Sequence, residues 1–468
     1  MQNSEVELPL PKRSIATTIE LPLFINMVAV SLTGPVVSNI ILYRTCVHSL
    51  NYTQDKCRPY LSPIKSNDTI NIEEEVQKYS TNVWTVKVVI EYLFPALLSL
   101  FLGVWSDTYG RKPLIVWPLL GMSLTGILIV VYSVMDNLGP WWYILTSVPF
   151  SVTGGYVILY SGAYCFVSDT SSSDSTTIRM TMVDATTSLG SVVGTMLSTY
   201  LILTIGNTYL LLITAALNVI AYAFTNIWIM ESLTGALQNG VSRIFDCLLV
   251  KEMFGECFKE RPNHGRAQII LLCFIRLLLV MILFGTVSLE YLYTRQKLHW
   301  SLRDYTEYSA TSTIVGLAGG FFGAIVLQKC LNIGDITFAT IAIITSTVDS
   351  LMKLFAVEKW QMYLGSSISM FRGLHGPLIR SFLKKTLPLE DISKVFFLVC
   401  MVESIGPLVA PVLFNSVYAM TLAIFPGAIY VLSTVMFASC LVMLGFVQYY
   451  SRNRESVNYL PIDNSTDT

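Results

Sequence analysis

Charged residues are scarce in this chain, and neither sign of charge prevails. Asp, Glu, Lys and Arg make up 13% of the 468 residues and give a formal net charge of −1, while 53% of the residues are hydrophobic. In a soluble domain roughly a quarter of the residues are charged. The composition therefore excludes an ordinary soluble domain and indicates a membrane protein. The balanced charge also provides no basic surface that would bind nucleic acid.

Motifs of chemical catalysis are missing as well. No nucleophile with a nearby base, no metal-ligand cluster and no phosphate-binding loop rises above the apolar background. We therefore expect that the protein is not an enzyme and that it has no metal site.

Apolar stretches of about 20 residues, the length that crosses a bilayer as a helix, recur along the whole chain. They lie at roughly 20–43, 84–105, 113–134, 142–167, 181–204 and 208–230, and then at 267–293, 306–328, 333–356, 361–382, 393–418 and 423–449. Each span must be a helix, because lipid cannot satisfy free backbone groups and the short alternating segments of a barrel are lacking. The sequence predicts an all-α membrane protein with twelve transmembrane helices in two six-helix halves.

This pattern divides the chain into five regions. They are a cytosolic N-terminus at 1–19, an N-terminal six-helix bundle at 20–230 with an outer loop at 44–80, a cytosolic central loop at 231–266, a C-terminal six-helix bundle at 267–449 and a disordered cytosolic tail at 450–468. The orientation follows from Lys and Arg residues, which gather on one side of the predicted spans and favour the cytosol. Because Lys12 and Arg13 precede the first apolar run, that run is expected to act as an uncleaved signal anchor.

The predicted outer loop contains features of a lumenal or extracellular segment. Cys46 and Cys57 lie in this polar stretch, so they are the two of nine cysteines that we expect to form a disulfide. Two glycosylation sequons, at Asn51 and Asn67, lie beside them. Both features agree with the orientation that the basic residues predict.

A ten-residue motif lies between the second and third spans. Gly103, Asp107, Gly110 and Arg111 stand at the fixed positions of the pattern G-x-x-x-D-x-x-G-R-[KR], which resembles the signature of the major facilitator superfamily. Gly110 suits a tight turn, and Asp107 can accept hydrogen bonds from Arg111 or from helix-terminal amides. The resemblance implies the major facilitator fold and a gating role for these four residues. A degenerate echo of the motif ends at Asp335 in the second half.

Further segments resemble solute carrier family 46, the proton-coupled folate transporter family. They are SDTSSSDSTTIRMTMVDA at 168–185, PLIR at 377–380 and LFNSVY at 413–418. The resemblance implies a role in proton coupling for Asp184 and a role in substrate binding for Arg380. The folate-transporting member differs where this chain has Gly155 and Leu283, and other members are linked to steroid conjugates, muramyl peptides and cyclic dinucleotides.

Ionisable residues inside the predicted spans are few, and each costs on the order of 3 kcal/mol unless it has a partner, a cavity or a function. Arg372, His375 and Arg380 recur in the tenth span, where we expect them to share a broad basic face. Guanidinium groups suit carboxylates and phosphates, so this face predicts an anionic substrate. Alternatively, Arg380 extends to the cytosolic headgroups beside the lysines that follow it.

Other charges in the spans leave alternatives open. His375 could take a proton near physiological pH, or it could be a satisfied structural group. Glu403 could carry a proton or simply neutralise Arg276 or Arg380. Asp184 could act in coupling or could be a carboxylate that the first turn of its helix favours. Arg276 needs a partner that the sequence does not identify.

The C-terminal tail contains a sorting pattern. Tyr459 and Ile462 stand at the fixed positions of Y-x-x-Φ, which is typical of endosomal and lysosomal targeting and would bind an adaptor. The plasma membrane and the endolysosomal membrane both remain open as locations.

These observations together predict a secondary active transporter in the lipid bilayer. We expect it to carry a small organic anion into the cytosol together with protons, with no cofactor besides that coupling ion. Arg380 and Arg372 would bind the anion, while Asp184, Glu403 and His375 would take protons. The alternatives are a proton-exchanging drug exporter and a membrane receptor that has lost transport.

Overall fold

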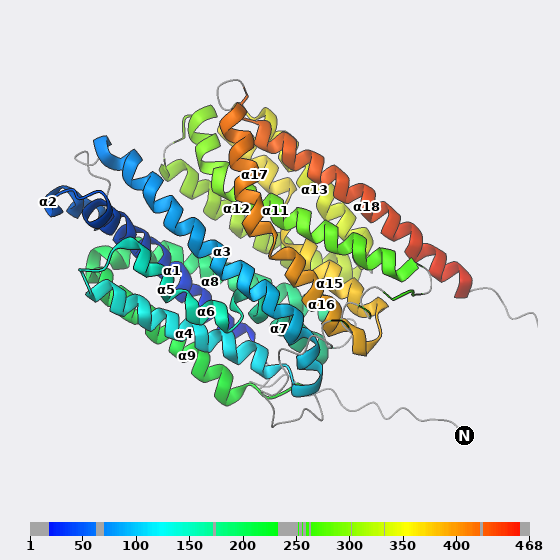
Figure 1. The fold of residues 1–468 in the computed structure, drawn as a ribbon. Coiled ribbons are helices and arrows are strands. Elements are labelled where there is room, and N and C mark those ends of the chain that lie inside the picture. The colour runs from blue at the N-terminus through cyan, green and yellow to red at the C-terminus, as the bar shows by residue number, and fades with distance from the viewer. Residues whose placement is uncertain are drawn as a thin grey trace, which may run out of the picture.

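The computed structural model of the chain describes residues 18–61, 70–171, 175–232, 251, 255, 259–261, 264–300, 302–331, 333–421 and 425–458. Within these residues the regular elements are all helices. Figure 1 shows them as two groups of long helices that lie side by side, one coloured blue to green and the other green to red. The predicted all-α class is therefore confirmed.

The first group, the N-terminal half, is formed by the chain from Glu20 to Trp228. Its elements are α1 (Glu20–Arg44), η2 (Thr45–Ser49), α2 (Gln54–Cys57), η3 (Arg58–Leu61), α3 (Ile70–Tyr109), α4 (Lys112–Val134), η5 (Pro140–Trp142), α5 (Tyr143–Thr146), α6 (Val148–Val152), α7 (Gly155–Thr170), α8 (Thr176–Ile205) and α9 (Asn207–Trp228).

The second group, the C-terminal half, is formed by the chain from Gly265 to Asn458. Its elements are α11 (Gly265–Lys297), α12 (Leu302–Phe322), η7 (Gly323–Cys330), α13 (Asp335–Phe355), α14 (Lys359–Ile368), η8 (Arg372–Leu374), α15 (His375–Thr386), α16 (Leu389–Glu403), α17 (Gly406–Thr421) and α18 (Ala428–Asn458).

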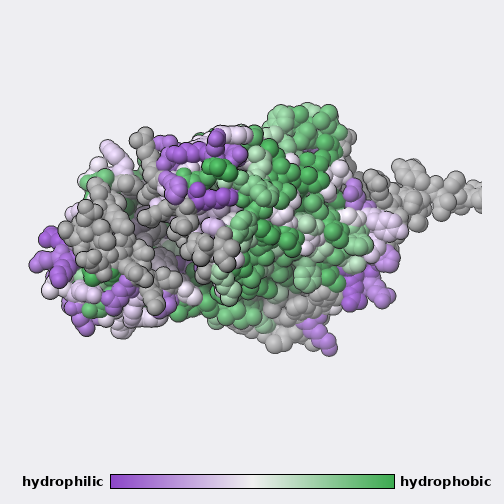
Figure 2. Space-filling view, turned by 90° about the horizontal axis from the view of Figure 1, so that it is seen from above, coloured by the Kyte–Doolittle hydropathy of each residue, from purple (hydrophilic) through white to green (hydrophobic). Residues whose placement is uncertain are grey.

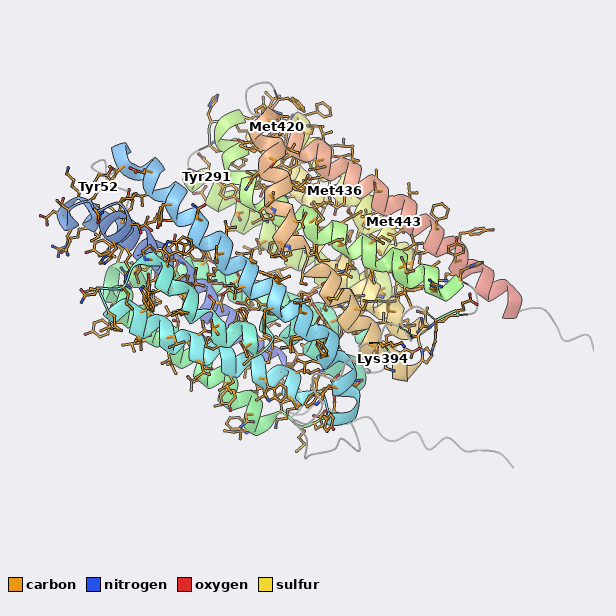
Figure 3. The ribbon with its side chains drawn as sticks, in the orientation of Figure 1. Tyr52, Tyr291, Lys394, Met420, Met436 and Met443 are labelled. Atoms are coloured by element: carbon orange, nitrogen blue, oxygen red, sulfur yellow. A yellow bond between two sulfur atoms is a disulfide. The ribbon has the colours of Figure 1, made fainter. Side chains whose placement is uncertain are left out.

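The long helices run between two ends of the molecule. One end carries a disulfide between Cys46 and Cys57, and we call it the disulfide end. The other end carries Arg111 and Lys384, and we call it the basic end. Figure 3 shows Tyr52 at the disulfide end and Lys394 at the basic end. The surface in Figure 2 has a broad band of apolar residues with hydrophilic residues at its two ends, as a molecule embedded in a bilayer requires.

Ten segments of the described chain are long and apolar enough to cross a membrane, so this is a multi-pass membrane protein. The other two predicted spans correspond to α3 and to the pair α14 and α15. In α3 the charges of Lys87 and Glu91 lie one turn apart and form an ion pair of 2.6 Å. The count of twelve spans stays a prediction.

Two predicted boundaries differ from the structure because a helix can continue into water beyond its apolar part. The outer loop predicted at 44–80 is shorter, since α3 already begins at Ile70 and η2 extends α1 to Ser49. The tail predicted to be disordered from 450 is helical as far as Asn458. Asn67, Tyr459 and Ile462 lie outside the described residues.

The span predicted at 361–382 is not one continuous helix. The helical hydrogen bonds stop after α14, and the chain tightens into a short 3₁₀ turn in which the Arg372 amide donates to the Ser369 carbonyl at 3.0 Å. α15 then starts at His375, with Pro377 in its first turn, where a missing N–H costs no hydrogen bond. Arg372 therefore lies in η8, ahead of the helix that holds His375 and Arg380, and the three residues do not belong to one continuous helix.

Two other predicted spans are also interrupted. Gly154 and Gly155 have positive φ angles of 106° and 53° between α6 and α7, a conformation that favours glycine. A Cβ on Gly155 would also lie 3.1 Å from the ring of Pro95 in α3. In the eleventh span α16 ends at Glu403 and α17 begins at Gly406, directly before Pro407.

A small cluster seals the disulfide end of the N-terminal half. The Cys46–Cys57 disulfide packs with Tyr60 and Val76, which joins the loop to α3. Beneath it the Arg44 side chain is almost fully buried, lies 3.8 Å over the ring of Tyr132 and donates to the Leu138 carbonyl at 3.2 Å. Asn51 lies exposed beside this cluster with a φ of 55°.

The exposed position of Asn51 generates a test of the predicted orientation. If the disulfide end faces the lumen, the chain carrying Asn67→Gln should still bear one glycan, because glycosylation of a sequon is a lumenal event. In that background Thr53→Ala should abolish the mobility shift on digestion with peptide N-glycosidase F, whereas Thr53→Ser, which preserves the sequon, should keep it. An undigested chain that already runs at the deglycosylated position would contradict the prediction.

Candidate functional site

A cavity of about 650 Å³ lies between the two halves. α7 and α8 line it from the N-terminal half, and α11, α12, α13, η8, α15, α16 and α18 line it from the C-terminal half. One stripe of α11, formed by Leu279, Leu283 and Val287, gives it an apolar wall. Leu283 and Val287 are 56% and 61% exposed, and they belong to the part of the cavity nearer the disulfide end.

The two halves meet in a set of hydrogen bonds at the basic end. Lys384 of α15 reaches across to the N-terminal half, where its ammonium donates to the Ser168 and Ser171 carbonyls at 2.5 and 2.8 Å. It also donates to the Thr176 hydroxyl at 2.9 Å. Deeper inside, the Thr177 hydroxyl donates to the Ser381 hydroxyl at 2.6 Å. These contacts close the cavity toward the basic end.

The closing contact at Lys384 is not a strong one. Burial lowers the pKa of this amine to about 8, and the nearby Asp169 carboxylate only partly opposes the shift. The hydrogen bonds therefore replace the hydration of the ammonium incompletely.

Arg111 of the sequence motif ties together three helices of the N-terminal half at the same end. Gly110 turns the chain with a φ of 107° between α3 and α4. The Arg111 guanidinium then donates to Ser106 at 2.6 Å and to the Asp169 carboxylate of α7 at 3.2 Å. Gly103 and Asp107 lie within α3, and their surroundings fall outside the described part of the chain. The gating role of the motif stays a prediction.

A buried cluster of three charges lies beside the cavity in the C-terminal half. Arg276 donates to the Glu403 carboxylate at 2.7 Å, and Arg380 donates to both oxygens of Glu403 at 3.0 and 2.9 Å. Glu403 is thus the partner of Arg276 that the sequence could not identify. The arrangement favours the reading of Glu403 as a counter-ion, because protonating it would leave two buried guanidinium groups without their shared carboxylate.

Gly376 lets these guanidinium groups approach each other. A Cβ at this position would lie 3.0 Å from Arg380 Nη1 and 3.3 Å from Arg276 Nη1. The break in the tenth span therefore positions both the backbone at Gly376 and the Arg380 side chain against Glu403.

A second charge cluster lies nearer the disulfide end and was missed in the sequence. Lys353 pairs with Glu290 at 3.1 Å and with Asp349 at 3.2 Å, and all three side chains line the cavity. The spacing of Asp349 and Lys353, one helical turn apart, was a signal that could have indicated the pair. The participation of Glu290, 59 or more positions away, could not be read from spacing.

Asp184 and Arg372 differ from the other charges that line the cavity. Among the described residues, neither has an oppositely charged group within ion-pair distance. The Asp184 carboxylate accepts a hydrogen bond from the Tyr164 hydroxyl. The Arg372 guanidinium donates to the carbonyl and the hydroxyl of Ser312, both at 2.8 Å. Each charge is thus held by neutral groups and faces the cavity.

All five residues that the sequence predicted for binding and coupling line this one cavity. His375 completes the set, with its Nε2 3.5 Å from the Ser346 hydroxyl. The lining contains four basic residues and four acidic residues. The basic ones are Arg276, Lys353, Arg372 and Arg380, and the acidic ones are Asp184, Glu290, Asp349 and Glu403. With all of them ionised the described lining is electrically neutral.

Comparison with known proteins identifies relatives along nearly the whole chain. The sequence profile of the Major Facilitator Superfamily matches residues 23–411. The "Probable peptidoglycan muropeptide transporter SLC46" of Drosophila melanogaster is 28% identical over 94% of this chain and 87% of its own length. The "Lysosomal proton-coupled steroid conjugate and bile acid symporter SLC46A3" of Gallus gallus is 26% identical over 91% of this chain and 92% of its own length.

A solved structure confirms the architecture. The crystal structure of the human organic anion transporter MFSD10 (TETRAN) superposes with a TM-score of 0.71 over 92% of this chain and 99% of the other, at 15% sequence identity. The resemblance to solute carrier family 46 and the predicted fold class are both confirmed.

The lowered pKa of Lys384 predicts how pH affects closure at the basic end. In the open conformation the hydrated amine should titrate near its ordinary value of about 10.4, so between about pH 8 and 10 the closed conformation binds fewer protons. Raising the pH through this window should therefore favour closure. The thiol of Ser381→Cys, at a buried position, should react with a maleimide about fivefold more slowly at pH 9.5 than at pH 7.5, once solvent screening is allowed for.

The exposed Cys330 supplies an internal reference for the pH dependence of the thiol reaction itself. Lys384→Ala should remove the effect. Lys385→Ala should keep it, because Lys385 pairs with Asp335 in its own half at 2.9 Å. An equal pH effect in both variants would contradict the assignment.

Proposed function

The chain belongs to the Major Facilitator Superfamily, a family of membrane transporters and not of enzymes, and from this premise we propose that it is a proton-coupled symporter of a small organic anion. The observation that carries the proposal is the pair of unmatched charges in the cavity. Arg372 presents a guanidinium without an acidic partner, and Asp184 presents a carboxylate without a basic one, among the described residues.

Arg372 supports the choice of an anionic substrate. Among the described residues the Arg372 guanidinium donates to Ser312 alone, which keeps donors available for a carboxylate, sulfate or phosphate. Arg380 is a further candidate donor, because its buried Nε makes no hydrogen bond to a described residue. Lys353 is a weaker candidate for the anion, since two carboxylates already neutralise it.

Asp184 supports proton coupling. Of the four carboxylates in the lining it is the one that can take a proton without breaking an ion pair between described residues. Protonation would change the lining from neutral to a net charge of about +1, which an incoming monoanion would cancel. Proton and anion would thereby favour each other's binding in a site where uncompensated charge is expensive.

The size and polarity of the cavity limit the class of substrate. A volume of about 650 Å³ falls within the range of about 300–1,000 Å³ that is typical of sites for drug-sized ligands. The apolar stripe of Leu279, Leu283 and Val287 favours an amphipathic anion, one with an apolar body and an acidic group. The first classes to test are therefore steroid conjugates, bile acids and muropeptides, which appear in the names of the two relatives.

The direction of transport follows from the predicted orientation. If the basic end faces the cytosol, the hydrogen bonds of Lys384 close the cytosolic side and the cavity is accessible from the lumen or the exterior. Protons and substrate would then load from an acidic lumen or an acidic extracellular space and leave toward the cytosol when the halves rock apart at the basic end. The tail pattern at Tyr459 leaves both the plasma membrane and the endolysosomal membrane in consideration.

The first test of this proposal is the role of Arg372 in uptake. Cells that express the chain with Tyr459→Ala, to favour the surface, should take up at least one of labelled taurocholate, estrone sulfate, muramyl dipeptide, folate or cyclic GMP-AMP. Uptake should be faster at pH 5.5 than at pH 7.4. Arg372→Gln should raise the KM by about tenfold or more, because a charge-assisted hydrogen bond contributes about 1.5–3 kcal/mol. Arg372→Lys, which keeps the charge, should lose less.

The same experiment separates the alternatives. Export from preloaded cells would identify a drug exporter. Saturable binding without accumulation would identify a receptor. Absence of uptake for every substrate at both pH values, with surface expression measured, would reject the symporter.

A second test concerns Asp184. The Asp184→Asn side chain is neutral at every pH, as protonated Asp184 is. Uptake by this variant should therefore lose its dependence on external pH between 5.5 and 7.4. Asp304→Asn offers a matched control, because Asp304 pairs with Lys359 at 2.6 Å away from the cavity. Acid stimulation that survives in Asp184→Asn would assign the proton to another group.

A further inference from the structure

Tyr164 of α7 touches Asp184, the carboxylate that we propose takes the proton, and Arg380, an additional candidate donor to the anion. Its hydroxyl donates to the Asp184 carboxylate of α8 in the same half. Its ring lies 4.0 Å from the Arg380 guanidinium carbon of α15, in the other half. The side chain is only 5% exposed, so it is held between the two charges.

We propose that Tyr164 is the positioning residue that links protonation of Asp184 to the placement of Arg380, and thereby couples the proton to the anion. The inference rests on the proposed symport and deepens it. Symport requires that each ligand change the free energy with which the other binds. Tyr164 is a physical contact through which both ligands can act.

The proton acts on the hydroxyl of Tyr164. While Asp184 is ionised, the phenol donates to a full negative charge, which is a strong hydrogen bond and fixes the ring. Once Asp184 is protonated the acceptor is neutral, and the bond that holds the phenol weakens.

The anion acts on the other face of Tyr164. The cation–π contact depends on Arg380 remaining over the ring, where Glu403 also holds it. An anion that binds the free Nε of Arg380 competes for the same guanidinium and draws it from the ring. Because this contact crosses from one half to the other, its loss removes one of the interactions that hold the two halves together.

Other charged and titratable groups surround this contact on every side. Besides Asp184 and Arg380, the groups that interact with it are Tyr160 of α7, Arg276 of α11, and Cys400 and Glu403 of α16. Arg276, Arg380 and Glu403 form one ion-paired unit. Among the charged residues of this set, Asp184 is therefore the one that can lose its charge without breaking an ion pair between described residues.

The deciding experiment compares Tyr164→Phe with the wild-type chain in uptake of whichever anion the panel identifies. Phenylalanine keeps the ring under Arg380 and removes the donor to Asp184. The ionised carboxylate loses its hydrogen bond, so the proton should bind at higher pH, and the pH of half-maximal uptake should rise by about one unit. The maximal rate at saturating acid should change little.

A matched control comes from the same stack of rings. Tyr156 lies two turns before Tyr164 in α7 and packs against Tyr160 with the ring centroids 6.2 Å apart, outside the cavity lining. Tyr156→Phe removes a comparable hydroxyl and should leave the pH profile in place. Tyr164→Leu, which also removes the ring, should shift the profile and in addition raise the KM for the anion.

The outcomes separate this inference from the proposed function. If wild type shows no acid-stimulated uptake, the proposed function fails and the inference fails with it. If the wild-type chain shows acid-stimulated uptake and Tyr164→Phe has the same pH profile as the wild type, the inference alone is overturned. Should Tyr164→Phe not reach the membrane, 3-fluorotyrosine at this position gives the opposite test. Its phenol is a stronger donor, so half-maximal uptake should move to lower pH, and an unchanged profile would overturn the inference.

Discussion

The sharing of one carboxylate by two guanidinium groups is the interaction on which the rest of this structure depends. Glu403 binds Arg276 at 2.7 Å and Arg380 at 2.9 Å, and all three side chains are mostly buried at the edge of the cavity. An unpaired charge at bilayer depth costs several kcal/mol, so the three residues must remain together in the folded protein. A side chain at Gly376 of α15 would crowd both guanidinium groups, because its Cβ would lie 3.0 Å from Arg380 Nη1 and 3.3 Å from Arg276 Nη1.

That pairing determines which charges are left for function. Glu403 forms ion pairs with both arginines. Lys353 forms ion pairs with Glu290 and Asp349, so one positive charge is shared by two carboxylates. Among the described charges of the cavity, Arg372 and Asp184 then lack partners. The structural pairs thus leave one cation and one anion facing a cavity, and a substrate anion with a proton is the combination that neutralises both.

The sequence predicted the spans and the residues that converge on the cavity, but not their contacts. Hydropathy located the apolar segments because every span that contacts lipid must be apolar, and the motif around Gly110 has a fixed local geometry. The sequence could not show that the tenth span breaks at Arg372, because a break depends on which residues pack beside it. Nor could the sequence show that Lys353 pairs with Glu290 or that Tyr164 contacts Asp184 and Arg380, because these partners come from other helices. The proposed role of Asp184 came from resemblance, and the absence of a basic partner for it among the described residues is visible only in three dimensions.

The distribution of strong and weak contacts suits a molecule that must rock. Every ion pair resolved between described residues of the two bundles joins groups of the same half. Between described residues, the contacts that cross between the halves include the hydrogen bonds of Lys384, Thr177 and Gln328, the cation–π contact of Arg380 and the edge-to-face contact of Tyr92 with Phe284. Each contributes about 1 kcal/mol, and the lowered pKa of Lys384 shows that its burial is incompletely compensated. Each half is thereby rigid, while the closure between them can be reversed by ligands whose binding differs between the two conformations by only a few kcal/mol.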